Sequence, residues 1–387
     1  MITLSTQDKQ YFQEVWEKVD RKMQKVAVRS YDKFPYTAVD GVHDEWKDSY
    51  LDWWTNGFWG GMMWILYMQT GIEQYIKSAL HAEEKLRKVI SENAMALHHD
   101  VGFMWNITSG VHYRLDGDKA ALNDVLLAAF SLASRFNLKG NYIRAWNPPA
   151  EDPSDNRNAG WVIIDCMMNI PLLYHASNIV GDPRFAHVAK AHADTTMKNH
   201  IREDGSVKHI VSYQPETGEV IEDFRGQGYE KGSAWSRGQA WALYGFTLSY
   251  IYTKDERYLN TAKKVANYFI SCLTAEKDFL PLCDFRAPAE PVIYDSSAGC
   301  CAACGLIELA NCVSEYEKPQ YLNAAVKLMK SMTEHFVDFS EDTDPLVMYA
   351  AEEYHGKNHM NLIYGDYFYV EALYKLVNEK KTDVLCW

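Results

Sequence analysis

One pattern recurs along the chain and constrains its fold more than any other feature. A helix-periodic apolar segment is followed by a short polar turn and then by an amphipathic segment rich in Lys and Ala. The turns are "TGIEQY", "LDGDKA", "VGDPRF", "TKDERY" and "YEKPQY". The first member of each pair is apolar nearly all round, which predicts a helix buried on every side. The second has one polar face, so we expect it to lie outside.

Five such pairs are visible, and the two ends of the chain supply a sixth. An amphipathic segment at 7–30 opens the chain, and the apolar segment "DYFYVEALYKLV" at 366–377 ends it. Pairing these two segments brings the termini together and closes a ring. The sequence therefore predicts an all-α (α/α)6 barrel of six inner and six outer helices, a single domain over residues 1–387. An open solenoid of helical repeats is the alternative, but its repeats would be more evenly spaced.

Two details of the barrel are also predicted. The apolar segments 102–114 and 166–179 are each expected to form one inner helix, with Pro171 in the first turns of the second or at a slight kink. The uneven spacing of the repeats implies long loops on one face. The Gly-rich stretch 213–233 is such a loop and is expected to carry a short hairpin.

Composition excludes several classes of partner. The net charge of −13, from 39 basic and 52 acidic residues, argues against nucleic acid or an anionic membrane as the main partner. The N-terminal segment lacks the basic patch and apolar core expected of a signal peptide, and no apolar run reaches the length expected of a membrane-spanning helix. The cysteines lie mostly in apolar contexts and predict buried thiols in a reducing cytoplasm, while the lone CxxC of Cys301 and Cys304 predicts no zinc site.

Polar and aromatic residues gather just before the inner segments. The stretches are "DWWTNGFWGG", "HHDVGF", "WVIID", "SAWSRGQAW", "YDSSAG" and "YGDYFY". If the inner helices are parallel, all these starts meet at one mouth, where free helix N–H groups favour an anion. Trp, His, Arg and two acids, Asp100 and Asp165, at such a mouth outline a site for a sugar acid.

Each of these residues also has a structural interpretation. Asp295 and Asp366 are interpreted as ordinary N-caps, but Asp165 fits capping less well because apolar residues flank it. Arg237 could bind a ligand or only pair with a nearby acid. Taken singly, the remaining candidates are typical of core or structural positions, namely Trp54, Trp235, Trp241, His98, His99 and His209.

Together, however, the motifs resemble those of glycoside hydrolase family 88, the unsaturated glucuronyl hydrolases. The resemblance runs from about residue 45 to 377 and rests on "WTNGFWGG", "HHDVGFM", "IIDCMMNIPLLY", "SAWSRGQAWALYGF", "DSSAGCCAACGL" and "GDYFYVEAL". It implies an enzyme without metal or cofactor. Such an enzyme hydrates the C4=C5 vinyl ether of a 4,5-unsaturated uronic acid at the non-reducing end of a lyase-generated oligosaccharide.

The resemblance also implies roles for individual residues. Asp165 matches the general acid/base, and Asp100 matches the second aspartate, which contacts sugar hydroxyls. The substrate-binding positions implied by the resemblance are Trp54, His209, Gln227, Arg237 and Trp241. Protonating an alkene carbon requires an acid that still holds a proton near neutral pH. An aspartate in an apolar wall beside another carboxylate suits this task, because burial and like-charge repulsion both raise the pKa of a carboxyl group.

Several alternatives stay open. The loop 349–366 lacks the Ser- and Lys-containing motif that contacts sulfate in some family members, which argues against a preference for heavily sulfated disaccharides. Family 105, the unsaturated rhamnogalacturonyl hydrolases, shares the barrel, and a sugar 2-epimerase could use the His98–His99 pair. A helical scaffold that binds partners is the non-enzymatic alternative. The chain is expected to be a monomer or weak homodimer.

Overall fold

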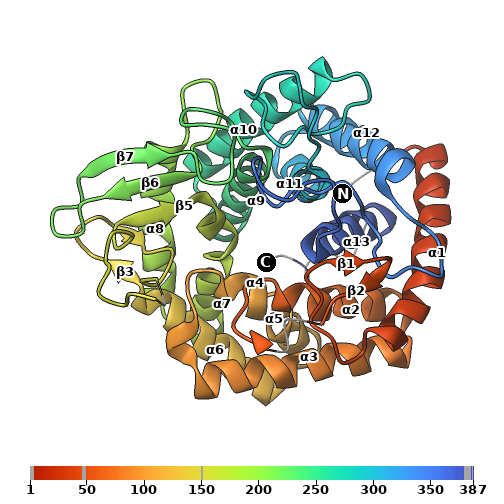
Figure 1. Ribbon diagram of the computed structural model, residues 1–387, viewed down its shortest axis with the longest axis horizontal. Helices are drawn as coiled ribbons and strands as arrows, with labels where there is room; N and C mark the ends of the chain where they lie inside the picture. Colours follow the sequence, from red (N-terminus) through yellow and green to blue (C-terminus); the bar gives the residue numbers. More distant parts are fainter. Residues whose placement is uncertain (1–3, 46–48, 150, 379–384, 386) are drawn as a thin grey trace.

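A ring of helices, seen end-on in Figure 1, makes up most of the protein. The computed structural model describes residues 4–45, 49–149, 151–378, 385 and 387. Inner and outer helices alternate along the chain and around the ring, which confirms the predicted (α/α)6 barrel.

The outer helices each bury one stripe of their surface. In α3 the buried side chains include Tyr75, Ala79, Ala82 and Leu86, three or four residues apart, so a single face meets the inner layer. The outer helices in the described chain are α1 (Thr6–Arg29), α3 (Glu73–Glu92), α6 (Lys119–Ser134), α8 (Arg184–His200), α10 (Glu256–Ala275) and α12 (Lys318–Phe336).

The inner helices are buried nearly all round. In α9 every residue from Ser236 to Ser249 is buried, as the apolar sequence predicts for a helix with neighbours on all sides. The inner positions are held by α2 (Asn56–Thr70), α4 (Val101–Trp105) with α5 (Ser109–Asp116), α7 (Pro171–Val180), α9 (Ser236–Thr253), α11 (Ser296–Cys312) and α13 (Ile363–Val377).

Several inner helices end in the same way, at a residue in the left-handed conformation. Gly71, Gly117 and Gly181 follow α2, α5 and α7 with φ of 70°, 79° and 67°. This left-handed conformation is almost free of cost for Gly, and it lets the Gly N–H bond a carbonyl of the last turn. Lys254 takes the same place after α9 at φ 57°.

Two inner helices differ from the prediction of one continuous helix each. Segment 102–114 breaks between α4 and α5, where Thr108 Oγ1 donates to Met104 O (2.6 Å) and Arg114 Nη2 donates to Asn106 O (3.1 Å). A continuous helix would give these carbonyls to backbone N–H groups. Segment 166–179 begins as a 3₁₀ turn, η3 (Ile164–Met168), and α7 starts at Pro171, whose missing N–H costs nothing in a first turn.

The termini meet as predicted. α13 packs against both α1 and α2, and the rings of Trp16 and Tyr374 lie 6.3 Å apart between α1 and α13. A Lys330–Asp8 ion pair of 2.5 Å joins α12 to α1. The C-terminal end of the chain lies inside the ring (Figure 1). There the ring of Trp387 stacks on that of Phe368, with centroids 5.7 Å apart. No helix among the described residues is long and apolar enough to cross a membrane.

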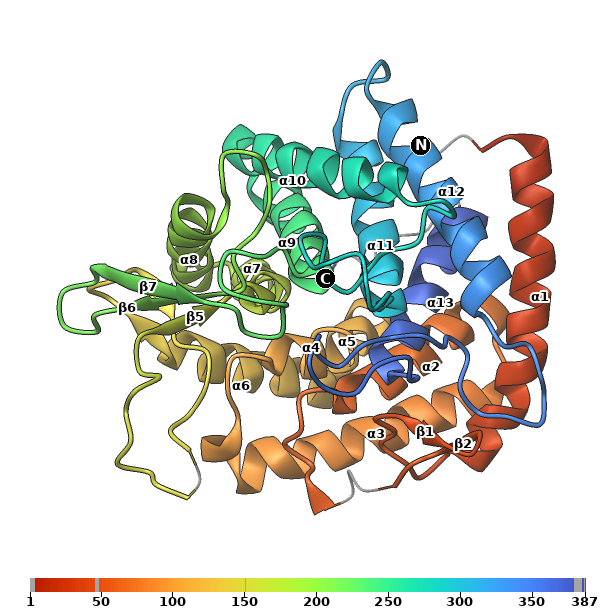
Figure 2. The ribbon, with the colours of Figure 1, turned by 45° about the horizontal axis from the view of Figure 1, so that its top comes forward.

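A three-stranded antiparallel sheet lies beside α8 at the edge of the ring (Figure 2). The predicted hairpin is present but begins earlier than expected, since β6 (Ile210–Tyr213) pairs with β7 (Val220–Phe224). The sequence did not predict the third strand, β5 (Trp161–Ile163), which pairs Ile163 with Ile210. That register places His209 beside the turn that carries Asp165. Shorter ladders join β1 (Ala38–Val39) to β2 (Val42–His43) and β3 (Phe136–Asn137) to β4 (Tyr142–Ile143), and η2 is Ala94–Ala96.

Candidate active site

The starts of the inner helices meet at one end of the barrel. Trp54, just before α2, lies 5.5 Å from Phe103 of α4 and 5.1 Å from Tyr364 of α13, measured between ring centroids. The Arg237 guanidinium of α9 lies 5.3 Å from the Tyr364 ring. These contacts require parallel inner helices, so the predicted common mouth is present.

Asp165 presents one carboxylate oxygen that the protein leaves unused. Its side chain is 16% exposed, and Oδ2 is buried without a hydrogen-bond partner among the described residues. His209 Nε2 lies 3.5 Å from this oxygen and likewise has no partner there. A buried polar atom without a partner costs about 1–3 kcal/mol, so a bound group that contacted both atoms would be favoured.

The orientation of His209 follows from the Gly-rich loop. His209 Nδ1 accepts a hydrogen bond from the backbone N–H of Gln227 at 2.9 Å, which leaves the proton of the neutral ring on Nε2, facing Asp165. A Cβ at Gly226 would lie 1.8 Å from Nδ1, and Gly226 has φ of 56°. Only Gly permits this approach. The His209 ring also lies 4.3 Å from the ring of Trp235, tilted by 39°.

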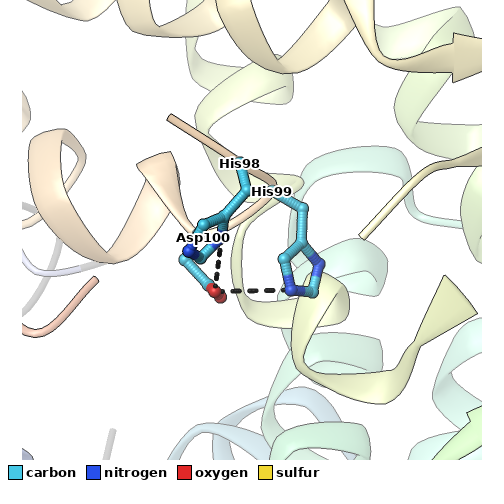
Figure 3. A group of neighbouring side chains, drawn as sticks. All are labelled: His98, His99 and Asp100. Atoms are coloured by element: carbon cyan, nitrogen blue, oxygen red, sulfur yellow. Dashed lines mark ion pairs between the residues drawn. The ribbon is translucent and has the colours of Figure 1, made fainter. Parts of the chain in front are cut away.

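The Asp100 carboxylate lies close to two imidazole rings, those of His98 and His99 (Figure 3). Its Oδ2 is 3.0 Å from His98 Nδ1 and 3.3 Å from His99 Nε2. Burial raises the pKa of Asp100, but the charge of His99 and the hydrogen bonds from both histidines outweigh burial and hold this pKa well below its usual range. Asp100 is therefore a fixed carboxylate. His98 and His99, interpreted from the sequence as structural when taken singly, both contact the candidate site.

Asn169 connects the two acids, and the sequence analysis missed it. Its Nδ2 donates to Asp100 Oδ1 and to the backbone carbonyl of Asp165, each at 3.1 Å, while its Oδ1 accepts from Phe103 N at 2.9 Å. A Cβ at Gly102 would lie 2.5 Å from the Asn169 backbone, so this close contact also requires Gly. The available signal was a lone amide within the apolar run "CMMNIPLL".

The two predicted tryptophans lie in an aromatic cluster. Trp54 is half-buried, whereas Trp241 is fully buried, 5.1 Å from Phe103 and 5.4 Å from Phe368. The indole N–H of Trp241 has no hydrogen-bond partner in the part of the chain that is described. Trp54 is thus the more accessible of the two for stacking on a sugar.

Arg237 makes a buried ion pair with Asp295. Nη1 lies 2.5 Å from Asp295 Oδ2 and also donates to Ala351 O, while Nη2 donates to Glu352 O at 2.7 Å. Burial lowers the pKa of Arg237, but Asp295 and, more weakly, Tyr364 outweigh burial and raise this pKa above its usual value. The guanidinium therefore stays charged. Of the two sequence interpretations, the structure shows the ion pair directly.

Gln227 contacts the same loop as Arg237. Its Nε2 donates to Glu352 O at 2.7 Å, and its backbone oxygen accepts from Tyr354 N at 2.9 Å. Tyr36 OH donates to Glu352 Oε1 at 2.8 Å. Two predicted substrate-binding residues therefore fix the loop around Glu352 at the mouth.

The two predicted N-caps have different outcomes. Asp295 does cap α11, accepting from Ser297 N, in addition to holding Arg237. The N-cap interpretation of Asp366 is wrong. Asp366 lies inside the first turn of α13, and its carboxylate accepts from the backbone N–H groups of Leu346 and Val347. The Asp366 carboxylate therefore accepts from a loop about twenty residues upstream, and not from the free N–H groups at the start of α13.

Because the Arg237–Asp295 pair is buried, Asp295→Ala should strongly destabilise the fold. It leaves a guanidinium buried without its counter-ion, and we expect a loss of about 3–5 kcal/mol. Asp255→Ala is a matched control, since Asp255 also caps a helix and pairs with an arginine but is 30% exposed, and should cost only about 0.5–2 kcal/mol. Urea unfolding of both variants measures the difference. Equal losses would contradict this account of the pair.

His98, His99 and Asp100 are also the described residues that could hold a metal. Their donor atoms all lie within 4.8 Å of one another (Figure 3). Two imidazoles and a carboxylate suit a divalent transition metal, yet the two histidines also account for the ionisation of Asp100 on their own. The sequence expectation of no metal and no cofactor stays a prediction.

Comparison with known proteins identifies relatives across most of the chain. The family model for Glycosyl Hydrolase Family 88 matches residues 19–370. The chain is 34% identical over 352 residues to the unsaturated glucuronyl hydrolase of Bacillus sp. (strain GL1), covering 89% of this chain and 91% of that protein. It is 33% identical over 339 residues to the unsaturated chondroitin disaccharide hydrolase of Streptococcus agalactiae, covering 84% and 82%.

Solved structures agree with these relatives. The crystal structure of unsaturated glucuronyl hydrolase from Bacillus sp. GL1 matches with a TM-score of 0.87 at 31% identity, covering 94% of this chain and 97% of that one. A mutant of the Streptococcus agalactiae enzyme complexed with dGlcA-GalNAc6S matches with a TM-score of 0.80 at 27% identity, covering 96% and 93%. The predicted resemblance is confirmed: the chain belongs to glycosyl hydrolase family 88 and is a glycoside hydrolase.

Proposed function

We propose that this enzyme hydrates the C4=C5 double bond of a 4,5-unsaturated glucuronic acid at the non-reducing end of glycosaminoglycan-type oligosaccharides. The observation that carries the proposal is the unpaired Oδ2 of Asp165, which faces His209 Nε2 while Asn169 ties its backbone to the ionised Asp100. The names of the two relatives, an unsaturated glucuronyl hydrolase and an unsaturated chondroitin disaccharide hydrolase, support this substrate class.

In the proposed mechanism Asp165 is the general acid and base. Because His98 and His99 hold Asp100 as a carboxylate, we assign the proton-donating role to Asp165. Asp165 gives a proton to C4, and water adds to C5 as the carboxylate takes a proton from it. The product is a hemiketal, whose ring opens to a ketone at C5. The hemiacetal left at C1 then releases the rest of the sugar.

The remaining residues have proposed roles in binding. Trp54 offers an accessible ring face for the sugar, and the unpaired N–H of Trp241 is a donor for a bound oxygen. His209 Nε2 faces the position where the attacking water would meet Asp165. Arg237 contributes fixed positive charge for the uronate carboxylate, while Gln227 contributes by holding the loop at Glu352.

The reaction has a direct optical test. Hydration destroys the conjugated double bond, so ultraviolet absorbance should fall when the enzyme meets lyase-generated unsaturated disaccharides. A panel from hyaluronan, chondroitin, heparin and pectin also distinguishes the alternatives. Turnover of pectin-derived disaccharides alone would favour the family 105 type of activity. A sugar 2-epimerase or a binding scaffold would leave the absorbance of every substrate unchanged.

Removal of metal ions should leave the rate unchanged. The proposed acid, base and water contacts come from Asp165 and His209, neither of which belongs to the cluster of donors around Asp100. We expect the rate after dialysis against a chelator to match the untreated rate in the same absorbance assay. A loss restored by adding Zn²⁺ would instead assign the His98–His99–Asp100 cluster to a catalytic metal.

We also propose that the enzyme works in the cytoplasm as a monomer or weak homodimer. All seven described cysteines are free, and five of them are buried, which supports a reducing compartment. Fractionation of cells tests the compartment. Measurement of the molar mass in solution by light scattering tests the oligomeric state separately.

A further inference from the structure

A polar pocket of about 410 Å³ lies on the surface behind the segment that leads to Asp100. Its walls come from η2 and the residue after it, from the end of α6 with the strand β3, and from the loop that follows β4. The polar residues that line it are Ser131, Ser134, Arg135, Asn137, Arg144 and Asn147.

Two arginines in this pocket lack a counter-ion. Arg135 donates to three backbone carbonyls, of Leu97, Arg144 and Ala145, and to Asn147 Oδ1. All four acceptors are neutral. Among the residues that the structure describes, no carboxylate lies within 4.0 Å of either Arg135 or Arg144.

Arg144 still has donors to offer. Its Nε donates to Trp146 O at 2.8 Å and its Nη2 donates to Asn158 Oδ1 at 2.7 Å. Nη1 has no hydrogen-bond partner in the described part of the chain. An arginine presents five N–H groups in a planar fork, so Arg144 can bind a further acceptor through this unused edge.

The two positive charges are unfavourable as they stand. Burial and, next in size, the charge of Arg144 together lower the pKa of Arg135 to about 10, although the charge of Asp100 acts in the opposite direction. The protein as a whole carries a net charge of −13, so this pair is a local exception that the composition does not explain. An anion in the pocket would relieve the repulsion and gain charge-assisted hydrogen bonds.

We propose that the Arg135–Arg144 pocket binds an oxyanion, a sulfate, phosphate or carboxylate group, through the free edge of Arg144. The pocket adjoins the candidate active site through the backbone. Arg135 donates to Leu97 O and Ala145 O, and His99 N donates to the same Ala145 O at 3.1 Å. The bound oxyanion can be a free inorganic ion or a charged group on an oligosaccharide.

Isothermal titration calorimetry with inorganic sulfate and inorganic phosphate tests the pocket directly. We expect binding to the wild-type chain and a loss of affinity of about tenfold or more in Arg144→Gln, which removes the charge. Arg144→Lys should keep most of the affinity. Arg157→Ala is a matched control, because Arg157 is 73% exposed and already paired with Asp155, and should bind like the wild type.

Four outcomes decide the proposal. Absence of sulfate and phosphate binding to the wild-type chain would overturn it, as would equal affinity in Arg144→Gln. Equal loss in Arg144→Lys and Arg144→Gln would show that packing rather than charge matters, and would also overturn it. A second disaccharide site per chain, seen with a sulfated but not an unsulfated disaccharide and lost in Arg144→Gln, would support it and identify the sugar as the source. Melting temperatures of the variants exclude unfolding as the cause. This proposal does not depend on the hydration activity.

Discussion

Asp165→Asn should abolish nearly all turnover while leaving the protein folded. The amide can neither give a proton to an alkene carbon nor take one from water, and loss of a general acid/base lowers rates by about 10² to 10⁴-fold. Because Oδ2 has no hydrogen-bond partner among the described residues, the substitution breaks no bond of that atom. We expect kcat to fall by about a thousandfold with an unchanged melting temperature.

Asp223→Asn is the matched control for this experiment. Asp223 lies in β7, is 22% exposed and faces Lys208 at 3.7 Å, so it resembles Asp165 in exposure and belongs to the same sheet region. Its replacement should leave the rate within about twofold, since surface changes have small effects on the fold. If the Asp165 variant kept most of its rate on every unsaturated disaccharide, the assignment of the acid would be wrong.

The second large effect is loss of stability in acid. His192 and His200, both on α8, are fully buried. Burial lowers the pKa of His192 to about 3 and that of His200 to about 4. His192 Nδ1 accepts from the backbone N–H of Ile143 at 3.0 Å, an interaction that only the ring with an unprotonated Nδ1 can make.

The direction of the pH effect follows from these pKa values. An unfolded histidine takes up its proton near pH 6.5, whereas the folded rings resist it until about pH 3 to 4. The unfolded state therefore binds more protons throughout that window. The contribution of these two rings to the free energy of unfolding is fully present above pH 6.5, and it falls as the pH is lowered toward 3. Each pKa unit is worth about 1.4 kcal/mol, so the two rings together account for several kcal/mol of a typical total of about 5–15.

Urea unfolding at pH 7.5, 5.5 and 4.5 measures this loss. His192→Gln removes one titrating ring and should flatten the fall between pH 6.5 and 4.5, even if it lowers stability at pH 7.5. His187→Gln is the control, because His187 lies on the same helix but is exposed, and should keep the wild-type slope. A wild-type stability that did not change between pH 7.5 and 4.5 would contradict the prediction.

The helical barrel was predictable because its signal is local. The alternation of all-apolar and one-sided segments distinguishes inner from outer helices within a window of about twenty residues. The left-handed Gly71, Gly117 and Gly181 mark where the inner helices end. Closure of the ring by the first and last helices followed from counting the pairs.

Only part of the candidate site could be predicted in this way. Asp100 and Asp165 stood out because acids in or beside apolar runs are costly unless something uses them. Their connection through Asn169 could not be predicted, because it depends on α4 and η3 lying side by side although 69 residues separate Asn169 from Asp100. The break between α4 and α5 was hidden for a similar reason, since it depends on tertiary contacts of Arg114 and Asn106.

The sequence by itself determined the class of fold and the order of inner and outer helices, and it singled out the two acids of the candidate site. The tertiary structure alone decided which donors and acceptors meet, as in the pairing of Arg237 with Asp295 and the loop that takes the carboxylate of Asp366. The physical reason is range. Hydrophobic periodicity is a property of one helix and can be seen in its own sequence. A buried hydrogen bond or ion pair requires a partner whose position is fixed only when distant segments pack together.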